Sequence, residues 1–185
     1  MTFRQFAYRN VTRNKRKYAA YFVSSAFSVM IFFLCALFIF HPAISEGMVL
    51  VTAANTMMVA EGIIYVFCSL FVLVSVGSFL QSRKLEFGLL LMHGMTKRQL
   101  NTMVFLENMM IGSSAIITGT LLGLLLGKLF LMIGSEFLGI APLEFHLSWK
   151  APVLTVCSFI LLFMIISLCT FAFIGKDSPY GLFHS

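Results

Sequence analysis

The stretch from Gln81 to Asn101, QSRKLEFGLLLMHGMTKRQLN, is a short basic segment between two long apolar runs. One run covers residues 60–81 and the other covers residues 102–133. Each has the roughly 20 mostly apolar residues that a helix needs to cross a bilayer. The stretch therefore predicts an elbow that joins two membrane-spanning helices on one side of a membrane, and residues 81–101 are called the elbow below.

Two further apolar runs cover residues 18–40 and 151–174. The chain of 185 residues is 59% hydrophobic and only 11% charged, which is too much apolar surface for one soluble core. Every run should be a helix, because an open sheet would leave backbone groups unpaired in lipid. The sequence predicts an all-α membrane protein with four transmembrane helices.

The first run resembles a signal peptide, because six Lys or Arg residues precede it. However, it is 23 residues long and carries no convincing small-residue cleavage site. We therefore interpret it as a retained span.

Basic residues are distributed unequally between the two sides of the predicted bundle. Eleven Lys or Arg residues precede the first run, lie in the elbow or follow the fourth run, whereas the other side holds Lys150 and, within the third run, Lys128. The acidic residues Glu46, Glu61, Glu136 and Glu144 fall on that other side. By the positive-inside rule, both termini are expected in the cytoplasm of a multi-pass cell-membrane protein. The net charge of +6 then reflects topology and contact with anionic lipids of the inner leaflet, not nucleic acid.

Residues 1–17 form the predicted cytoplasmic segment before the four-span domain of residues 18–176, and residues 177–185 form a cytoplasmic tail. Thr2 and Gln5 fit a capping box at the start of a helix. Helical spacing places four apolar residues on one face, opposite the arginines: Phe3, Phe6, Ala7 and Val11. This pattern favours an amphipathic helix in the membrane interface, and the alternative is a disordered basic tail.

The elbow has its own pattern of helix signals. From Arg83 to His93 the pattern stays helical, so the second span is expected to continue into the cytoplasm, with Leu85, Leu89 and Met92 along one stripe. Gly94 follows and supplies a left-handed residue that ends a helix.

A new helix is expected to begin after this stop. Thr96 and Gln99 fit a second capping box, and Lys97 and Arg98 occupy the first exposed turn. The alternative is a plain cytoplasmic turn whose charges only set topology.

Three glycines recur every four residues in the third run: Gly119, Gly123 and Gly127. They line one helix face and permit close approach of a neighbouring helix, whereas Gly112 lies off this face. The segment is no nucleotide-binding loop, because its spacing is wrong and Leu129 follows Lys128 where Ser or Thr is required.

Glu107 lies about two turns after the elbow, where a carboxylate either reaches interfacial water or makes a polar contact inside the bundle. The chain offers no catalytic, cofactor or metal cluster, because its histidines are scattered over four segments. The cysteines match no zinc or redox spacing and are expected as apolar core residues: Cys35, Cys68, Cys157 and Cys169.

These features together resemble the FtsX-like permeases of ATP-binding-cassette systems. The likeness is carried by RKLEFGLLLMHGMTKRQL of residues 83–100, by Glu107 and by the glycine series of the third run. The opening FRQFAYRNVTRNKRKYAAYF and the closing KDSPYGLF are also similar to that family. The Phe-rich first span and short first outer loop, residues 41–59, are most similar to permeases of the bacitracin-resistance type in Gram-positive bacteria.

The resemblance implies a permease that works with a dimeric cytoplasmic ATPase and exports antimicrobial peptides or removes them from the cell envelope. We expect Leu89, Met92 and Met95 to offer the ATPase an apolar contact, with Gly94 and Thr96 shaping the turn, while the basic pair of residues 97–98 complements acidic groups. Several such systems also partner a membrane sensor histidine kinase. The alternatives are a non-transporting relay from an ATPase to a kinase or cell-wall enzyme, and a small structural membrane protein.

Permeases of this family are longer, with a second membrane block and a large outer domain. The 185 residues are accordingly expected to be a fragment, the amino-terminal half of a permease, or a naturally short protein. A missing second half, or a second copy of the chain, is the corresponding partner.

Overall fold

The computed structural model describes residues 15–41, 51–138 and 148–176, and these residues form helices and turns without a strand. The helices are α2 (Lys15–Ile39), α4 (Val51–Gln81), α5 (Lys84–Met92), α6 (Lys97–Leu138) and α7 (Lys150–Lys176). All except α5 are long and apolar enough to cross a membrane. The predicted all-helical protein with four spans is confirmed. The predicted amphipathic helix of residues 1–17 falls almost entirely outside the described residues.

The helix boundaries differ from the predicted spans in two places. Helix α4 begins at Val51, nine residues before the predicted start, so the expected outer loop of residues 41–59 is shorter. Helix α6 extends beyond both ends of the apolar run of residues 102–133. Apolarity marks the part of a helix that suits lipid, whereas a helix can extend further through residues that suit the interface.

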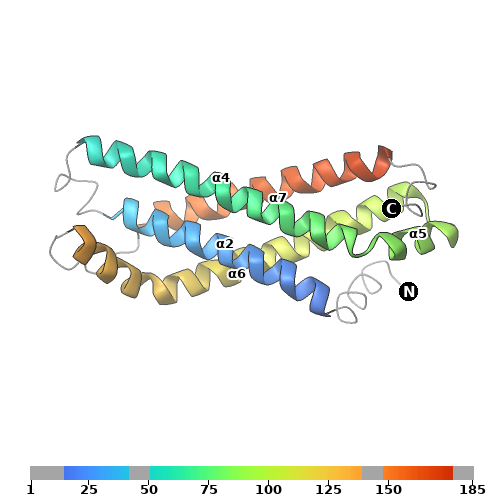
Figure 1. The fold of residues 1–185 in the computed structure, drawn as a ribbon, viewed down its shortest axis with the longest axis horizontal. Coiled ribbons are helices and arrows are strands. Elements are labelled where there is room, and N and C mark those ends of the chain that lie inside the picture. The colour runs from blue at the N-terminus through green and yellow to red at the C-terminus, as the bar shows by residue number, and fades with distance from the viewer. Residues whose placement is uncertain (1–14, 42–50, 139–147, 177–185) are drawn as a thin grey trace.

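The four long helices lie side by side along the length of the molecule, and α5 lies at the end where α4 finishes and α6 begins (Figure 1). That end is called the elbow end below, and the opposite one the far end. Helix α2 packs against α4, α6 and α7 and is the central element of the bundle. Aromatic residues of α2, α4 and α7 dominate the main core cluster, including Tyr21, Phe32, Phe79, Phe159 and Phe163.

Helix α6 approaches α2 closely at the glycine face. A Cβ atom added to Gly119 would lie 2.6 Å from the carbonyl oxygen of Ala26, and one added to Gly123 would lie 2.5 Å from the Phe33 ring. Gly127 is also buried. The expectation that Gly112 lies off the glycine face is wrong, because seven residues make nearly two full turns and place Gly112 on the same side of α6 as Gly119. A Cβ atom added to Gly112 would lie 2.8 Å from the ring of Phe163 on α7. The same side of α6 therefore packs against α7 at Gly112 and against α2 at Gly119 and Gly123.

Helix α4 leaves a wide apolar face uncovered. Its exposed side chains include Ile63, Phe67, Phe71 and Val74. Such a face suits lipid or other membrane helices. The expectation that all four cysteines lie in the core is also wrong: Cys68 is buried, Cys35 is half-buried, and both Cys157 and Cys169 are exposed on α7. In a bilayer a residue can be apolar and still face outward.

Candidate functional site

The elbow begins with a break that the sequence pattern does not reveal. Helix α4 ends at Gln81, and α5 starts only at Lys84, so the second span does not continue unbroken to His93 as predicted. At the break, the Arg83 N–H donates to the carbonyl oxygen of Leu80, and the Arg83 backbone has φ −115° and ψ 4°. This turn points the Arg83 side chain back into the bundle, where none of its surface is exposed.

Inside the bundle, Arg83 forms an ion pair with Glu107 of α6 through its Nη1 atom and the Oε2 atom of Glu107. Both side chains are fully buried. The Arg83 Nε–H also donates to Glu86 Oε2 at 3.0 Å, and the Tyr18 hydroxyl of α2 donates to Glu107 Oε1 at 3.2 Å. One buried arginine thus connects the elbow to α6 and, through Glu107, to α2.

Three aromatic rings surround the guanidinium group. Its central carbon lies 5.3 Å from the ring centre of Tyr18, 5.4 Å from that of Phe79 and 5.0 Å from that of Phe87. Electron-rich ring faces attract a cation at these distances, and they also exclude water. The ion pair is consequently enclosed by residues from α2, α4 and α5.

The charge of Arg83 is maintained in this enclosed position. Burial acts to lower the pKa of the Arg83 guanidinium, but the Glu107 carboxylate, the Tyr18 oxygen and the hydrogen bonds to Glu107 and Glu86 together raise this pKa above its ordinary value. One guanidinium nitrogen, Nη2, is buried without a hydrogen-bond partner among the described residues. The removal of Arg83 would leave the buried Glu107 charge without its ion-pair partner, and the removal of Glu107 would leave Arg83 with only the partly exposed Glu86 carboxylate; both changes are unfavourable.

The end of α5 is fixed by hydrogen bonds of a Schellman motif. Gly94 has a positive φ of 89°, its N–H donates to the carbonyl oxygen of Leu91, and the Met95 N–H donates to that of Leu90. Leu90 and Met95 also pack against the same small core cluster, as expected for this motif.

A reciprocal pair of hydrogen bonds starts α6. The Thr96 N–H donates to Gln99 Oε1 at 3.0 Å, and the Gln99 N–H donates to Thr96 Oγ1 at 3.3 Å. These are the two bonds of a capping box. Lys97 and Arg98 follow on the exposed side of the first turn.

The short helix α5 has one face on the bundle and one face open. Phe87 is buried against Leu100 and Val104 of α6. On the open side, Leu85, Leu89 and Met92 expose 70%, 56% and 73% of their surfaces. The open side therefore carries an apolar stripe, which is called the α5 stripe below.

Met95 differs from the other residues expected to contact an ATPase. It is half-buried and packs against the cluster of Phe87, Leu100 and Val104. Its truncation would therefore disturb the fold of the elbow itself, so it cannot report on the α5 stripe alone.

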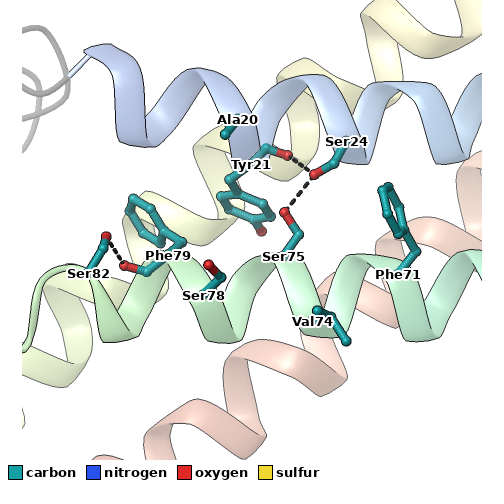
Figure 2. Close-up of a pocket in the computed structure, with 9 residues that line it drawn as sticks. All are labelled: Ala20, Tyr21, Ser24, Phe71, Val74, Ser75, Ser78, Phe79 and Ser82. Atoms are coloured by element: carbon teal, nitrogen blue, oxygen red, sulfur yellow. Dashed lines mark hydrogen bonds between the residues drawn. The ribbon is translucent and has the colours of Figure 1, made fainter.

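The contact between α2 and α4 next to the pair of Arg83 and Glu107 is partly polar. The hydroxyl groups of Ser24 and Ser75 lie 2.6 Å apart, within hydrogen-bond distance. Figure 2 shows this pair beside Tyr21 in a groove that Ser78 and Phe79 also line. A side-chain hydrogen bond of this type helps to hold two membrane helices together.

The structure adds two residues that the sequence reasoning did not select. Arg83 was counted only as a basic residue of the elbow, and Glu61 only as an acidic residue of an outer segment. Both are buried inside the bundle. For Glu107, burial and the ion pair exclude the alternative in which its carboxylate reaches interfacial water. The available sequence signal for Arg83 was its position at the boundary of an apolar run, which charged residues occupy so commonly that it carries little information.

Comparison with known protein families identifies the family of this sequence. A family model described as FtsX-like permease C-terminal matches residues 58–179, which is more than half of the chain. The chain belongs to the FtsX-like permease family. The matched residues of this permease include α4 from Met58 onward, the elbow with Arg83, and Glu107 of α6.

Similar proteins are found in Bacillus subtilis strain 168. The ABC transporter permease protein YxdM is 49% identical over 182 residues, which are 98% of this chain and 29% of that protein. The uncharacterized ABC transporter permease YvcS is 38% identical over 95% of this chain, and the bacitracin export permease protein BceB is 29% identical over 99% of it. Each alignment covers 28% of the relative. The chain thus spans less than a third of the length of these relatives, and it is, like them, a multi-pass membrane protein of the ABC permease type.

Proposed function

We propose that this chain is a membrane part of an ATP-binding-cassette permease and that a separate cytoplasmic ATPase docks on its elbow. The observation that carries the proposal is the α5 stripe, an exposed apolar surface joined to the membrane helices by the buried pair of Arg83 and Glu107. An exposed apolar surface beside basic residues is typical of a docking site. ATP hydrolysis is assigned to the partner, and no catalytic role is assigned to this chain.

In this proposal, the pair of Arg83 and Glu107 transmits movement. A displacement of α5 pulls on Arg83, because the residue lies at the start of that helix. Arg83 is held by Glu107 of α6, and Glu107 in turn accepts a hydrogen bond from Tyr18 of α2. Packed elements joined in this way move together, so a push on the elbow reaches two spans.

The orientation proposed for the bundle places the elbow in the cytoplasm and the far end outside, as the distribution of basic residues favours. A cysteine-free background with a single cysteine at Ser148, next to α7 at the far end, should react with an impermeant thiol reagent in intact cells. A single cysteine at Leu85, on the exposed side of α5, should react only after lysis. Reaction of the Leu85→Cys protein in intact cells would refute this orientation.

The substrate proposed for the whole system is an antimicrobial peptide, which is exported or removed from the cell envelope. Its support is the similarity to a relative named a bacitracin export permease. Susceptibility of a deletion strain to bacitracin, with and without the complete system restored, tests this part of the proposal.

Coexpression with the cytoplasmic ATPase of the same ATP-binding-cassette system, followed by copurification, tests the docking surface. Truncation of Leu89 and Met92 to Ala should strongly reduce the amount of ATPase recovered, because apolar anchors dominate the affinity of most interfaces. The matched control truncates Leu125 and Leu129, two leucines of α6 that are similarly exposed but lie far from the elbow. Equal recovery from both double variants would overturn the docking proposal.

Charge reversal at Lys97 and Arg98 should act differently. These residues are exposed at the rim of the elbow, where charges mainly steer association. We expect the doubly reversed protein to bind the ATPase more slowly and with less dependence on salt, with little change in the dissociation rate. The anionic headgroups of the inner leaflet are a second partner proposed for these side chains.

A further inference from the structure

Glu61 is a buried carboxylate that forms no hydrogen bond with any residue that the structure describes. It lies in α4, six residues after the start of the apolar span at Asn55, or roughly 9 Å along the helix axis. Only 9% of its surface is exposed, and neither carboxylate oxygen has a hydrogen-bond partner among the described residues. An ionisable residue inside a membrane helix is expensive to keep and usually has a function.

The Glu61 side chain lines an open cavity of about 350 Å³ between α2, α4 and α7. Phe32, Tyr65 and Leu154 form part of its wall, and Met58 lies one turn before Glu61 on α4. The cavity has room beside Gly62, because a Cβ atom added there would meet nothing within 4 Å. Both Glu61 oxygens are covered, so the carboxylate has to turn toward this space to meet a ligand.

Aromatic residues of this wall are held in place by contacts with their neighbours. The ring centres of Phe32 and Tyr65 are 5.5 Å apart, and the Tyr65 hydroxyl donates to the carbonyl oxygen of Ser158 at 3.1 Å. Aromatic rings attract cations, and a carboxylate in an apolar cavity attracts them more strongly than one in water. The other walls are apolar and suit a hydrocarbon chain.

We propose that Glu61 binds the ammonium or guanidinium group of a cationic amphiphile, whose apolar part lies in this cavity and in the adjoining lipid. The Glu61 carboxylate supplies the counter-charge for the bound cation, and the cation lies against the faces of the aromatic rings. The position near the far end gives access from the membrane. The biological meaning of this site rests on the proposed permease function, because it gives that function a cationic ligand. Binding itself requires no ATPase.

The single tryptophan of the chain provides a reporter. Trp149 precedes Leu154 of the cavity wall by five residues, and its side chain is 80% exposed. The protein is reconstituted in nanodiscs of zwitterionic lipid and titrated with a brominated long-chain alkylammonium ion, because bromine quenches tryptophan fluorescence. The matching brominated alcohol measures quenching that results from partition into the lipid alone.

The wild-type protein should show saturable quenching by the ammonium probe above the level given by the alcohol. Glu61→Gln should weaken this binding by about tenfold or more, the ratio expected for the loss of one charge-assisted hydrogen bond. Glu136→Gln is the matched control, because it removes the same charge from an exposed position near the end of α6. It should leave the binding unchanged.

Glu61→Asp provides a second variant that keeps the charge, and it should still prefer the ammonium probe to the alcohol. Equal affinity of the wild-type and Glu61→Gln proteins would overturn the proposal, as would a wild-type protein that does not distinguish the ammonium probe from the alcohol. Since these titrations contain no ATPase, failure here is distinct from failure of ATPase copurification.

Discussion

The elbow end and the far end of the bundle each contain a buried carboxylate, but within the described residues only the one at the elbow end has a counter-charge. Glu107 at the elbow end is paired with Arg83 and accepts a hydrogen bond from Tyr18. Glu61 near the far end has no partner for either oxygen among the described residues. Burial of a charge is unfavourable in both places, and the Arg83 guanidinium offsets this cost at the elbow end, whereas no described residue does so for Glu61. The paired carboxylate thus stabilises a connection, whereas the unpaired one is available to a ligand.

The two carboxylates should respond in opposite ways to the same substitution, and this is the largest effect we expect. Glu107→Gln removes the fully buried counter-charge of Arg83 and leaves only the partly exposed Glu86 carboxylate beside it, which should lower the free energy of unfolding by about 3–5 kcal/mol. Glu61→Gln removes an unpaired carboxylate and should leave the free energy of unfolding unchanged or raise it. Titration with SDS in bicelles measures the free energy of unfolding of both variants. A similar loss in the two proteins would show that the ends of the bundle do not differ in this way.

Close packing between α2 and α6 connects the two ends, so its disturbance should have the next largest effect. Gly119→Ala places a methyl group against the carbonyl oxygen of Ala26, which is backbone and cannot rotate away. We expect a loss of about 1–3 kcal/mol in the free energy of unfolding, as is typical of overpacking.

Gly62→Ala is the matched control on α4, because its new methyl group meets nothing within 4 Å. Since Ala favours the helix over Gly by up to about 1 kcal/mol, this variant should be as stable as the wild type or more stable. A loss at Gly62 as large as that at Gly119 would mean that the α2–α6 contact is not the cause.

The local structure of the elbow could be predicted from sequence better than its connection to the bundle. Gly94 and the pair of Thr96 and Gln99 act on their immediate neighbours, so their spacing reveals the stop and the restart of a helix. Arg83, in contrast, contacts a glutamate 24 residues away, and that glutamate contacts Tyr18, which is 89 residues away in the chain. No periodic pattern relates such distant positions.

The four spans could likewise be predicted because apolarity over a sufficient length is a local property. The residues that are buried within the bundle could not be predicted in this way, because in a membrane both faces of a helix are apolar and only packing distinguishes them. This is why the two exposed cysteines of α7 differ from the expected core positions. It also explains why the sequence shows Glu61, the second residue of the apolar run, only as an acidic residue on the outer side and not as a buried one. Gly112, in contrast, is predictable, because it lies seven residues, or nearly two turns, before Gly119.

The smallest effect is expected at the capping box, which shapes the elbow without joining it to the bundle. Thr96→Ala removes the hydroxyl that accepts the Gln99 N–H and should cost about 1 kcal/mol of stability. Thr102→Ala is a suitable comparison, because its hydroxyl only bonds back to the carbonyl oxygen of Arg98 within the same helix. Thermal unfolding in detergent would resolve the two variants, and equal melting temperatures would argue against a capping role.

The central claim is that Arg83 and Glu107 act as a pair that joins the elbow to the membrane helices, and a double-mutant cycle tests it most directly. Unfolding free energies are measured in bicelles for the wild type, Arg83→Met, Glu107→Gln and the protein with both changes. Because each single change leaves one buried group without its partner, we predict that the double variant is more stable than the sum of the two losses implies, by about 2–3 kcal/mol. Losses that add to within about 0.5 kcal/mol would contradict the account, because the two residues would then be independent.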